Sequence, residues 1–332
     1  MNDFSVVIPL YNAAAHIGAT LDAVLAQTRP AAEVIVVDDG STDAGPAIAA
    51  GYGDRVTLLH QQQNRGVQAA RNRGIEAAAG DWIALCDADD LWAPGYLARQ
   101  AALLASVPRL DFSFANFRRL VDGAPEAFTK FDQAPAGFWE DAGRRVLPEG
   151  WVFDRPIAGL TFVWHPIFPS ATVLSRGLVA AVGGFDPALR GLRPEDGEFT
   201  LRCLYRAAVG ALPDPLVTIR RHDGNTTRDT VRTLVDEVTA LQFVRAHHAP
   251  AQPYWPVIDE QIRRRRIAAA HGAFAQRDHA LLRRLFADIA PADRGAALRA
   301  KAAVAALPPP LDAWTNAALQ RLSALAGRGG GR

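Results

Sequence analysis

Residues 4 to 11, FSVVIPLY, form a short apolar run, and three similar runs follow within the first ninety residues. They are EVIVVDD (33–39), VTLLHQ (56–61) and DWIALCD (81–87). Helix-length stretches separate them, and between Ala13 and Gln27 apolar residues recur at helical spacing. Short apolar strands that alternate with helices are typical of a parallel sheet with helices on both faces. We therefore expect a Rossmann-like α/β domain in this part of the chain.

The later sequence changes character twice. From Leu110 to Pro169 the pattern becomes irregular, as in a binding loop or lid. Strand character returns at SATVLSR (170–176) and ALPDPLVTIRRH (211–222), and the chain is then helical between prolines. We expect one domain over residues 1–228 and an all-helical region over 229–332.

Composition excludes several classes of protein. The 36 basic and 35 acidic residues give a net charge of +1, so no overall attraction to nucleic acid is expected. Cys86 and Cys203 form no disulfide framework, the first residues lack signal-peptide features, and no uncharged run approaches the ~20 residues of a membrane span. We expect a cytoplasmic protein. Peripheral contact with the inner face of the membrane through the C-terminal helices stays open; the run Arg263–Arg266 is either a solvated helix surface or such a contact.

Three acids, Asp87, Asp89 and Asp90, stand together at the end of the fourth apolar run. Their charges repel one another unless a cation neutralises them. Mg²⁺ and Mn²⁺ take oxygen ligands and commonly combine one or two carboxylates with substrate phosphates. The alternative is a solvated acidic turn that caps the helix beginning near Pro94.

A second polar cluster, VVDDGSTD (36–43), follows the second run. Asp38 or Asp39 could accept a hydrogen bond from a nucleobase or a ribose hydroxyl, and the Gly-Ser-Thr turn allows close backbone approach. A compatible alternative is that Ser41 or Thr42 caps the next helix.

Five segments resemble the family 2 glycosyltransferases in order and spacing. They are IPLYN (8–12), VVDDGSTD (36–43), NRGVQAARNRGI (64–75), AAGDWIALCDADD (78–90) and RPEDGEFTLR (193–202). The resemblance covers residues 4 to 225 and implies a GT-A fold with a mostly parallel sheet. It also implies a nucleotide-binding part over residues 1–110 and an acceptor-binding and catalytic part over 111–228.

The resemblance implies a set of residues that bind a nucleotide sugar. The set is Pro9, Tyr11, Asn12, Asp38, Asp39, Arg71, Asp87 and Ala88. Tyr11 and Asp39, or Asp38, would contact the base or ribose, and Asp87 would approach the ribose.

The resemblance also implies metal and catalytic residues. Asp89 would hold Mn²⁺ or Mg²⁺ on the diphosphate, and His222 matches a position that can reach the metal or the phosphates, a simple turn being the alternative. Glu195 and Asp196 fall on the family's Glu-Asp pair, in which the aspartate is the general base. An inverting transfer needs such a base beside the acceptor hydroxyl, and a bound metal stabilises the leaving diphosphate.

Two departures from the family pattern narrow the prediction. Ala13 to Ala15 stand where an acid is frequent, and Gln242 and Arg245 are followed by Ala246, so the Gln-x-x-Arg-Trp motif of processive synthases is absent. A transferase of single sugars is therefore expected. Six aromatic residues of the irregular region are either acceptor contacts or core: Phe131, Phe138, Trp139, Trp151, Phe153 and Trp164.

The expected function is metal-dependent, inverting transfer of a hexosyl group from a nucleotide-diphosphate sugar, UDP-linked, to a hydroxyl of a glycan or lipid-linked acceptor, in cell-surface glycan biosynthesis. Two alternatives stay open. One is a nucleotide-sugar-binding protein without activity, consistent with Ala13 to Ala15. The other is a sugar-phosphate nucleotidyltransferase, although YNAAAH stands where that class carries a Gly-rich loop with arginine.

Overall fold

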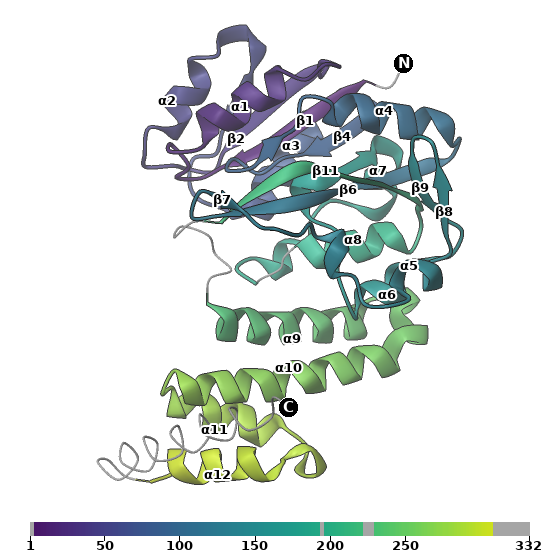
Figure 1. Cartoon of the computed structure of the whole chain (residues 1–332). Helices are drawn as coiled ribbons and strands as arrows, with labels where there is room; N and C mark the ends of the chain where they lie inside the picture. Colours follow the sequence, from purple (N-terminus) through teal and green to yellow (C-terminus); the bar gives the residue numbers. More distant parts are fainter. Residues whose placement is uncertain (1–2, 193–195, 222–228, 308–332) are drawn as a thin grey trace. The chain divides into compact units, whose positions relative to one another are not determined.

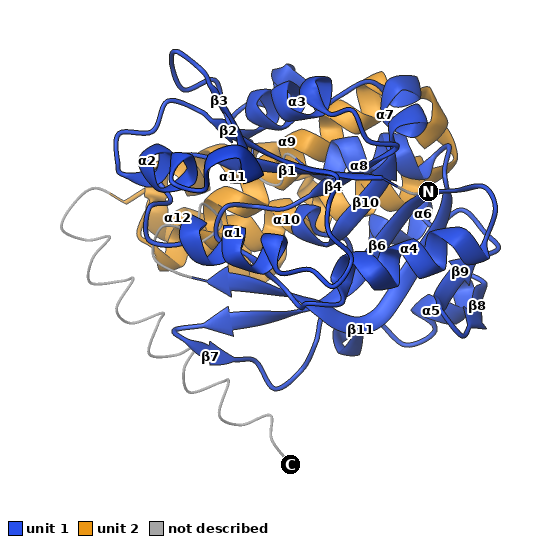
Figure 2. Ribbon diagram, turned by 90° about the horizontal axis from the view of Figure 1, so that it is seen from above, with its two compact units in different colours: residues 1–225 blue, residues 226–332 orange. Residues whose placement is uncertain are grey.

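The computed structural model describes residues 3–192, 196–221 and 229–307. The chain divides into two compact units, residues 1–225 and 226–332, coloured separately in Figure 2. The expected boundary at residue 228 lies outside the described residues.

Unit 1 is built on one mixed sheet whose first half is parallel (Figure 1). Strands β1 (Phe4–Leu10), β2 (Glu33–Asp38), β3 (Thr57–His60) and β4 (Trp82–Leu85) pair in parallel in the order β3-β2-β1-β4. All seven β1 residues are buried, as expected for a strand covered on both faces. The predicted α/β class is confirmed.

Antiparallel strands extend the sheet beyond β4. Strand β10 (Thr172–Ser175) pairs antiparallel with β4 and with β6 (Leu110–Val121), and β6 runs parallel to β11 (Ala208–Arg221). The hairpin of β8 (Arg144–Leu147) and β9 (Gly150–Phe153) follows β11, while β5 (Leu91–Trp92) and β7 (Ala124–Pro125) pair with β11 and β6. The expectation of an irregular region from Leu110 onward is wrong at its start, because residues 110–121 form the 12-residue strand β6, which pairs with β11 along its length.

Helices cover both faces of the sheet. The chain forms α1 (Ile17–Leu25), α2 (Gly45–Ala50), α3 (Val67–Ala77), α4 (Tyr96–Ser106), α5 (Phe138–Asp141), α6 (Ala158–Thr161), α7 (Arg176–Val182) and α8 (Asp196–Leu204). Alternate residues of a strand face opposite sides, and Val6, Ile8 and Leu10 pack in one core with α1 and α4. On the other face α3 approaches β1 so closely that a Cβ on Gly74 would lie 2.4 Å from Val7 Cγ1.

Unit 2 is helical in its described part, which confirms the predicted C-terminal helical region. It contains α9 (Thr230–His247), α10 (Trp255–Ala275), α11 (His279–Asp288) and α12 (Ala296–Ala305), with a separate core that includes Val231, Phe274, Leu282 and Leu298. Across residues 3–192, 196–221 and 229–307, no helix has the length and apolar character needed to cross a membrane.

Candidate active site

The loops after β1 and β2 are tied together at the carboxyl end of the sheet. Asn12 adopts a left-handed backbone conformation (φ 48°); its amide donates to Ser41 Oγ at 3.1 Å and its side-chain oxygen accepts from the Thr42 amide at 2.8 Å. This linkage leaves Tyr11 half exposed beside the strand ends, while Pro9 is buried in β1. The alternative that Ser41 or Thr42 caps the next helix is wrong, because α2 has Ala44 at its N-cap and no side-chain cap.

Asp38 and Asp39 are buried, and both bind neighbouring loops. Asp38 accepts from the Ser41 amide at 2.9 Å, and its other oxygen lies 3.2 Å from His60 Nδ1. Asp39 accepts from two consecutive backbone amides, those of Arg65 at 2.7 Å and Gly66 at 2.8 Å. Burial raises the pKa of Asp39, although these amides oppose the shift. The pair therefore fixes the loop that enters α3, and a ligand would meet only their remaining lone pairs.

The three acids of the turn after β4 differ in burial: Asp90 is buried, whereas Asp87 and Asp89 are partly exposed. Asp90 is 1% exposed; one carboxylate oxygen accepts from Ser170 Oγ and the other accepts from the Arg220 amide at 3.1 Å. Ser170 Oγ also accepts from the Asp87 amide at 2.8 Å. Asp87 and Asp89 are half-buried.

The alternative of a solvated acidic cap is wrong for this turn. Helix α4 begins at Tyr96, has Gly95 at its N-cap and has no acid in its first turn. Asp90 is instead enclosed, and burial raises its pKa well above the ordinary range, helped by the charges of Asp89 and Asp87. The turn thus holds acids that repel one another, which favours a bound cation.

Arg71 pairs with the acidic turn, and its charge acts on Asp196 at the start of α8. This buried side chain of α3 pairs with Asp87, Nη2 to Oδ1 at 2.8 Å, and its guanidinium lies 5.2 Å from the centre of the Phe185 ring. Burial raises the pKa of Asp196, the Arg71 charge lowers it and the Asp87 charge raises it. Asp196, Arg71 and Asp87, which come from three distant segments, therefore share one electrostatic environment.

Two predicted site residues, Glu195 and His222, lie outside the described residues. Within residues 3–192, 196–221 and 229–307, no group of three or more His, Cys, Asp or Glu side chains is arranged to hold a metal ion. The described donors for a divalent ion are the two half-buried carboxylates of Asp87 and Asp89. Two carboxylates suit Mg²⁺ or Mn²⁺ when substrate phosphates complete the coordination.

Sequence reasoning missed the residues that support the site. Thr20 of α1 donates to the Ala88 carbonyl at 2.9 Å and so fixes the acidic turn to α1. Asn72 bonds both backbone groups of Phe185, at 2.7 and 2.9 Å, and Gln68 donates to the Leu189 carbonyl at 3.0 Å. The sequence did contain an indication of two of them. Gln68 and Asn72 are four residues apart within NRGVQAARNRGI, so both lie on the face of α3 that meets the segment before α8.

The aromatic residues of the middle region pack against one another. Trp139 lies within 4.7 to 6.0 Å, centroid to centroid, of the rings of Phe131, Phe138, Trp151, Phe153 and Trp164. Phe131, Phe138, Trp139 and Phe153 are each less than a tenth exposed. The core interpretation holds for these four, while Trp151 and Trp164 remain half-buried.

Comparison with known proteins identifies the family. The model of glycosyl transferase family 2 matches residues 5–130. EpsH of Bacillus subtilis, named as a glycosyltransferase, is 42% identical over 246 residues, which cover 73% of this chain and 67% of EpsH. The chain belongs to glycosyltransferase family 2. TuaG of B. subtilis, named as a glycosyltransferase of teichuronic acid biosynthesis, is 35% identical over 148 residues, 43% of this chain and 58% of TuaG. A relative from Escherichia coli is matched over 26% of its length.

Solved structures show the same fold. TarS of S. aureus in complex with UDP-GlcNAc gives a TM-score of 0.61 at 19% identity, over 86% of this chain and 80% of that one. The mannosyltransferase PcManGT of Pyrobaculum calidifontis, in complex with GDP-Man and Mn²⁺, gives 0.55 at 20% identity, over 96% and 86%. The family 2 glycosyltransferase described here therefore has the predicted GT-A fold.

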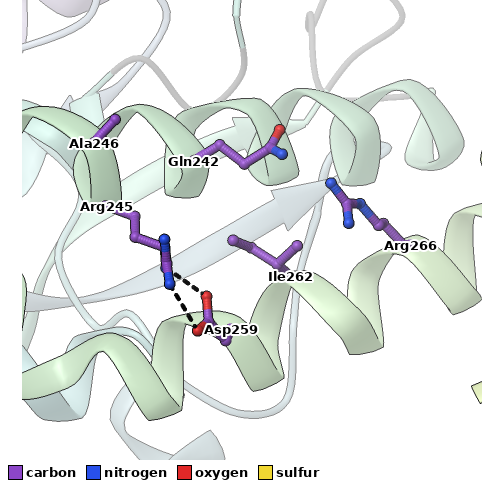
Figure 3. A pocket seen from close by; sticks show the side chains of 6 residues that line it. All are labelled: Gln242, Arg245, Ala246, Asp259, Ile262 and Arg266. Carbon is purple, nitrogen blue, oxygen red and sulfur yellow. Dashed lines mark hydrogen bonds and ion pairs between the residues drawn. The ribbon is translucent and has the colours of Figure 1, made fainter. Parts of the chain in front are cut away.

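A separate pocket of about 320 Å³ lies in unit 2 (Figure 3). It is lined by Gln242, Arg245, Ala246, Asp259, Ile262 and Arg266. Arg245 and Asp259 form an ion pair at 2.7 Å inside it, so the opposite charges of this pair compensate each other.

The arginine run of α10 is paired within unit 2. Arg263 and Arg264 bind Glu260, Arg265 binds Glu237, and Arg266 donates to the Asp288 carbonyl. Three of the four arginines therefore have a carboxylate partner within unit 2, and Arg266 has a backbone carbonyl.

Proposed function

We propose that this family 2 glycosyltransferase transfers a single sugar from a UDP-linked donor to a hydroxyl of a glycan or lipid-linked acceptor, with inversion, in cell-surface glycan biosynthesis. The carrying observation is the Arg71 centre, which pairs with Asp87 and shares its electrostatic environment with Asp196. The proposal of a UDP donor is supported by the TarS complex with UDP-GlcNAc, and that of glycan biosynthesis by the name of TuaG.

In this proposal Asp196 is the general base. A carboxylate that accepts the acceptor's hydroxyl proton contributes about 10²- to 10⁴-fold in rate. The enclosed position that raises its pKa brings the carboxyl closer to the pH of the reaction, which strengthens it as a base, while the Arg71 charge keeps it ionised. Glu195, the other acid of the family pair, is assigned to the same catalytic step.

The nucleotide end of the donor is assigned to the ends of β1, β2 and β4. Tyr11 offers an exposed aromatic face for the base, and Asp39, with Asp38, offers carboxylate lone pairs to the base or ribose. Pro9 and Asn12 frame this place, and Arg71, Asp87 and Ala88 line the path toward the diphosphate.

Asp89, together with Asp87, would hold a divalent ion, and His222 is a further candidate ligand. PcManGT was solved with GDP-Man and Mn²⁺, which supports a metal in this fold. When bound, the ion supplies Lewis-acid stabilisation of the diphosphate leaving group. The half-buried carboxylates of the acidic turn fit that role because oxygen ligands suit hard cations.

The test is a screen of nucleotide sugars, first by thermal shift with and without Mn²⁺ and then by transfer to a panel of hydroxyl acceptors, with the anomeric configuration of the product read by NMR. We expect a UDP-sugar to stabilise the protein and the product to have inverted configuration. Asp196→Asn should abolish transfer and keep donor binding, whereas Asp141→Asn, an exposed acid on α5, should behave as wild type.

Four results would contradict the proposal. Retained configuration, or full activity of Asp196→Asn, refutes the assigned mechanism. Binding of UDP without transfer to any acceptor or to water would instead indicate a binding protein. Pyrophosphate release from a nucleoside triphosphate would indicate a nucleotidyltransferase.

A further inference from the structure

The carboxyl ends of β6 and β11 carry arginines on one face of the sheet. The two strands pair in regular register there, with Phe117 opposite Val217 and Arg119 opposite Ile219. Because alternate residues share a face, Arg119 follows Phe117, and Arg221 follows Ile219, on the face that is buried in the main core. Both arginines are half-buried, so the core of unit 1 ends in cationic side chains at this edge.

Lys130 is brought to the same edge by backbone pairing. The Glu126 amide donates to the Arg119 carbonyl at 2.9 Å, and the Lys130 amide donates to the Phe117 carbonyl at 2.8 Å. The segment 126–130 therefore runs beside β6. The Lys130 ammonium lies 4.7 Å from the centre of the Trp164 ring, a cation–π contact that positions it.

Arg119 and Lys130 carry charges that the described residues do not neutralise. Across residues 3–192, 196–221 and 229–307, neither side chain has an ion-pair partner. Burial and, to a smaller extent, the charge of Arg119 together lower the pKa of Lys130 to about 8. Holding two unpaired cations near each other costs stability, so an anionic ligand is the natural explanation of their placement.

The strand order separates this pair from the nucleotide site. Tyr11, Asp39 and Asp87 stand at the ends of β1, β2 and β4, whereas Arg119 and Lys130 belong to the edge formed by β6 and β11, with β10 between β4 and β6. The acidic turn lies between the two regions: it follows β4, and its Asp90 accepts a hydrogen bond from the Arg220 amide in β11. The cations therefore lie beyond the acidic turn as seen from the nucleotide residues, where an acceptor would approach.

We propose that Arg119 and Lys130 bind an anionic group, a phosphate or a carboxylate, on the sugar acceptor, so that the acceptors of this enzyme are acidic. The inference rests on the proposed glycosyltransferase function and adds the acceptor's chemical class to it. Arginine presents a planar fork of donors to such groups, and lysine adds a point charge. A phosphate that links a glycan to a lipid and an acidic group within a soluble glycan have the same chemistry.

The first experiment compares acceptors that differ only in charge, with the donor found by the screen above. One arm pairs methyl glucuronide with methyl glucoside, and the other pairs a farnesyl-pyrophosphate-linked sugar with the neutral farnesyl glycoside of the same sugar. We expect wild type to prefer the acidic member of at least one pair by about tenfold or more in kcat/KM, because a hydrogen bond to a charged group contributes that much. The arm in which the preference appears identifies the source of the charge.

The variants are Arg119→Gln, Lys130→Gln and the double variant, with Arg145→Gln on β8 as the control that removes one charge elsewhere. The double variant should lose the preference for acidic acceptors while releasing UDP from the donor in water at the wild-type rate. An equal preference in the double variant and in wild type overturns the proposal. If wild type itself releases no UDP from any donor, the proposed function is refuted instead.

A binding measurement needs no turnover. Inorganic phosphate is titrated calorimetrically into enzyme saturated with UDP and Mg²⁺, so that the donor site is filled. Wild type and Arg145→Gln should bind phosphate and the double variant should bind it at least about tenfold more weakly. Equal binding by all three, or no binding by wild type, contradicts the proposal.

The melting temperature of the double variant should equal or exceed that of wild type, because the repulsion between the two cations has been removed. A lower value would indicate that the cations stabilise the fold.

Discussion

Replacing Arg71 with glutamine tests the link between the acidic turn and α8. Arg71 is 2% exposed, and the side chain of its partner Asp87 is 21% exposed. Removing one partner of a buried ion pair costs about 3–5 kcal/mol. Because Asp87 keeps some contact with water, we expect about 2–3 kcal/mol for Arg71→Gln. Arg73→Gln, an exposed residue of the same helix, is the matched control and should change stability by less than about 0.5 kcal/mol.

Urea denaturation of four proteins measures this effect: wild type, Arg71→Gln, Asp87→Asn and the double variant. The double-mutant cycle should give a coupling energy of about 1–3 kcal/mol between the two positions. Purely additive losses would show that the 2.8 Å contact contributes nothing, and the reasoning about the site would fail.

The same variant has a pH signature. In the proposed mechanism Asp196 accepts a proton only when it is ionised, so the rate should fall as pH drops through its pKa, which burial raises. The Arg71 charge opposes that rise, so Arg71→Gln should move the acid limb of the kcat profile to higher pH. An acid limb that stays at the wild-type position would mean that Arg71 does not act on the base.

Three further predictions concern the scaffold. Gly74→Ala should destabilise by about 1–3 kcal/mol despite the better helix propensity of alanine, since its Cβ would meet Val7 at 2.4 Å, whereas Gly95→Ala, with nothing within 4 Å, should be nearly neutral in thermal melts. Trp139→Ala should cost about 3–5 kcal/mol of stability and leave donor affinity unchanged, because the ring is core; a change in donor KM alone would contradict this. Ser170→Ala should cost about 2–4 kcal/mol in denaturation, because it leaves the partly buried Asp87 amide and a buried Asp90 carboxylate oxygen without their shared hydroxyl.

The first half of the sheet was predictable because β1, β2 and β4 are almost fully buried and therefore read as continuous apolar runs, while the more exposed edge strand β3 keeps the apolar pair Leu58 and Leu59. Strand β6 was not, because LDFSFANFRRLV mixes apolar and polar residues and its pairing with β11 depends on contacts between distant segments. Burial patterns in the sequence also gave no sign that β10 inserts antiparallel between β4 and β6.

The acidic residues of the candidate site were predictable from strand ends, but their division of labour was not. The sequence presents Asp87, Asp89 and Asp90 as equivalent neighbours, whereas only the fold directs Asp90 inward to Ser170 and the Arg220 amide. Arg71 was assigned to the site by its place in a family motif. Its ion pair with Asp87 could not be predicted, because it depends on the approach of α3 to the end of β4. The unpaired cations Arg119 and Lys130 followed from strand register, which a local pattern does not determine.

The central claim, that Asp89 serves metal-dependent donor binding while Asp196 serves the proton transfer, is tested most directly by one calorimetric titration. UDP is titrated into wild type, Asp89→Asn and Asp196→Asn, with and without Mn²⁺. The account predicts that Mn²⁺ strengthens UDP binding in wild type and Asp196→Asn but not in Asp89→Asn. An undiminished Mn²⁺ effect in Asp89→Asn, or its loss in Asp196→Asn, would contradict the account.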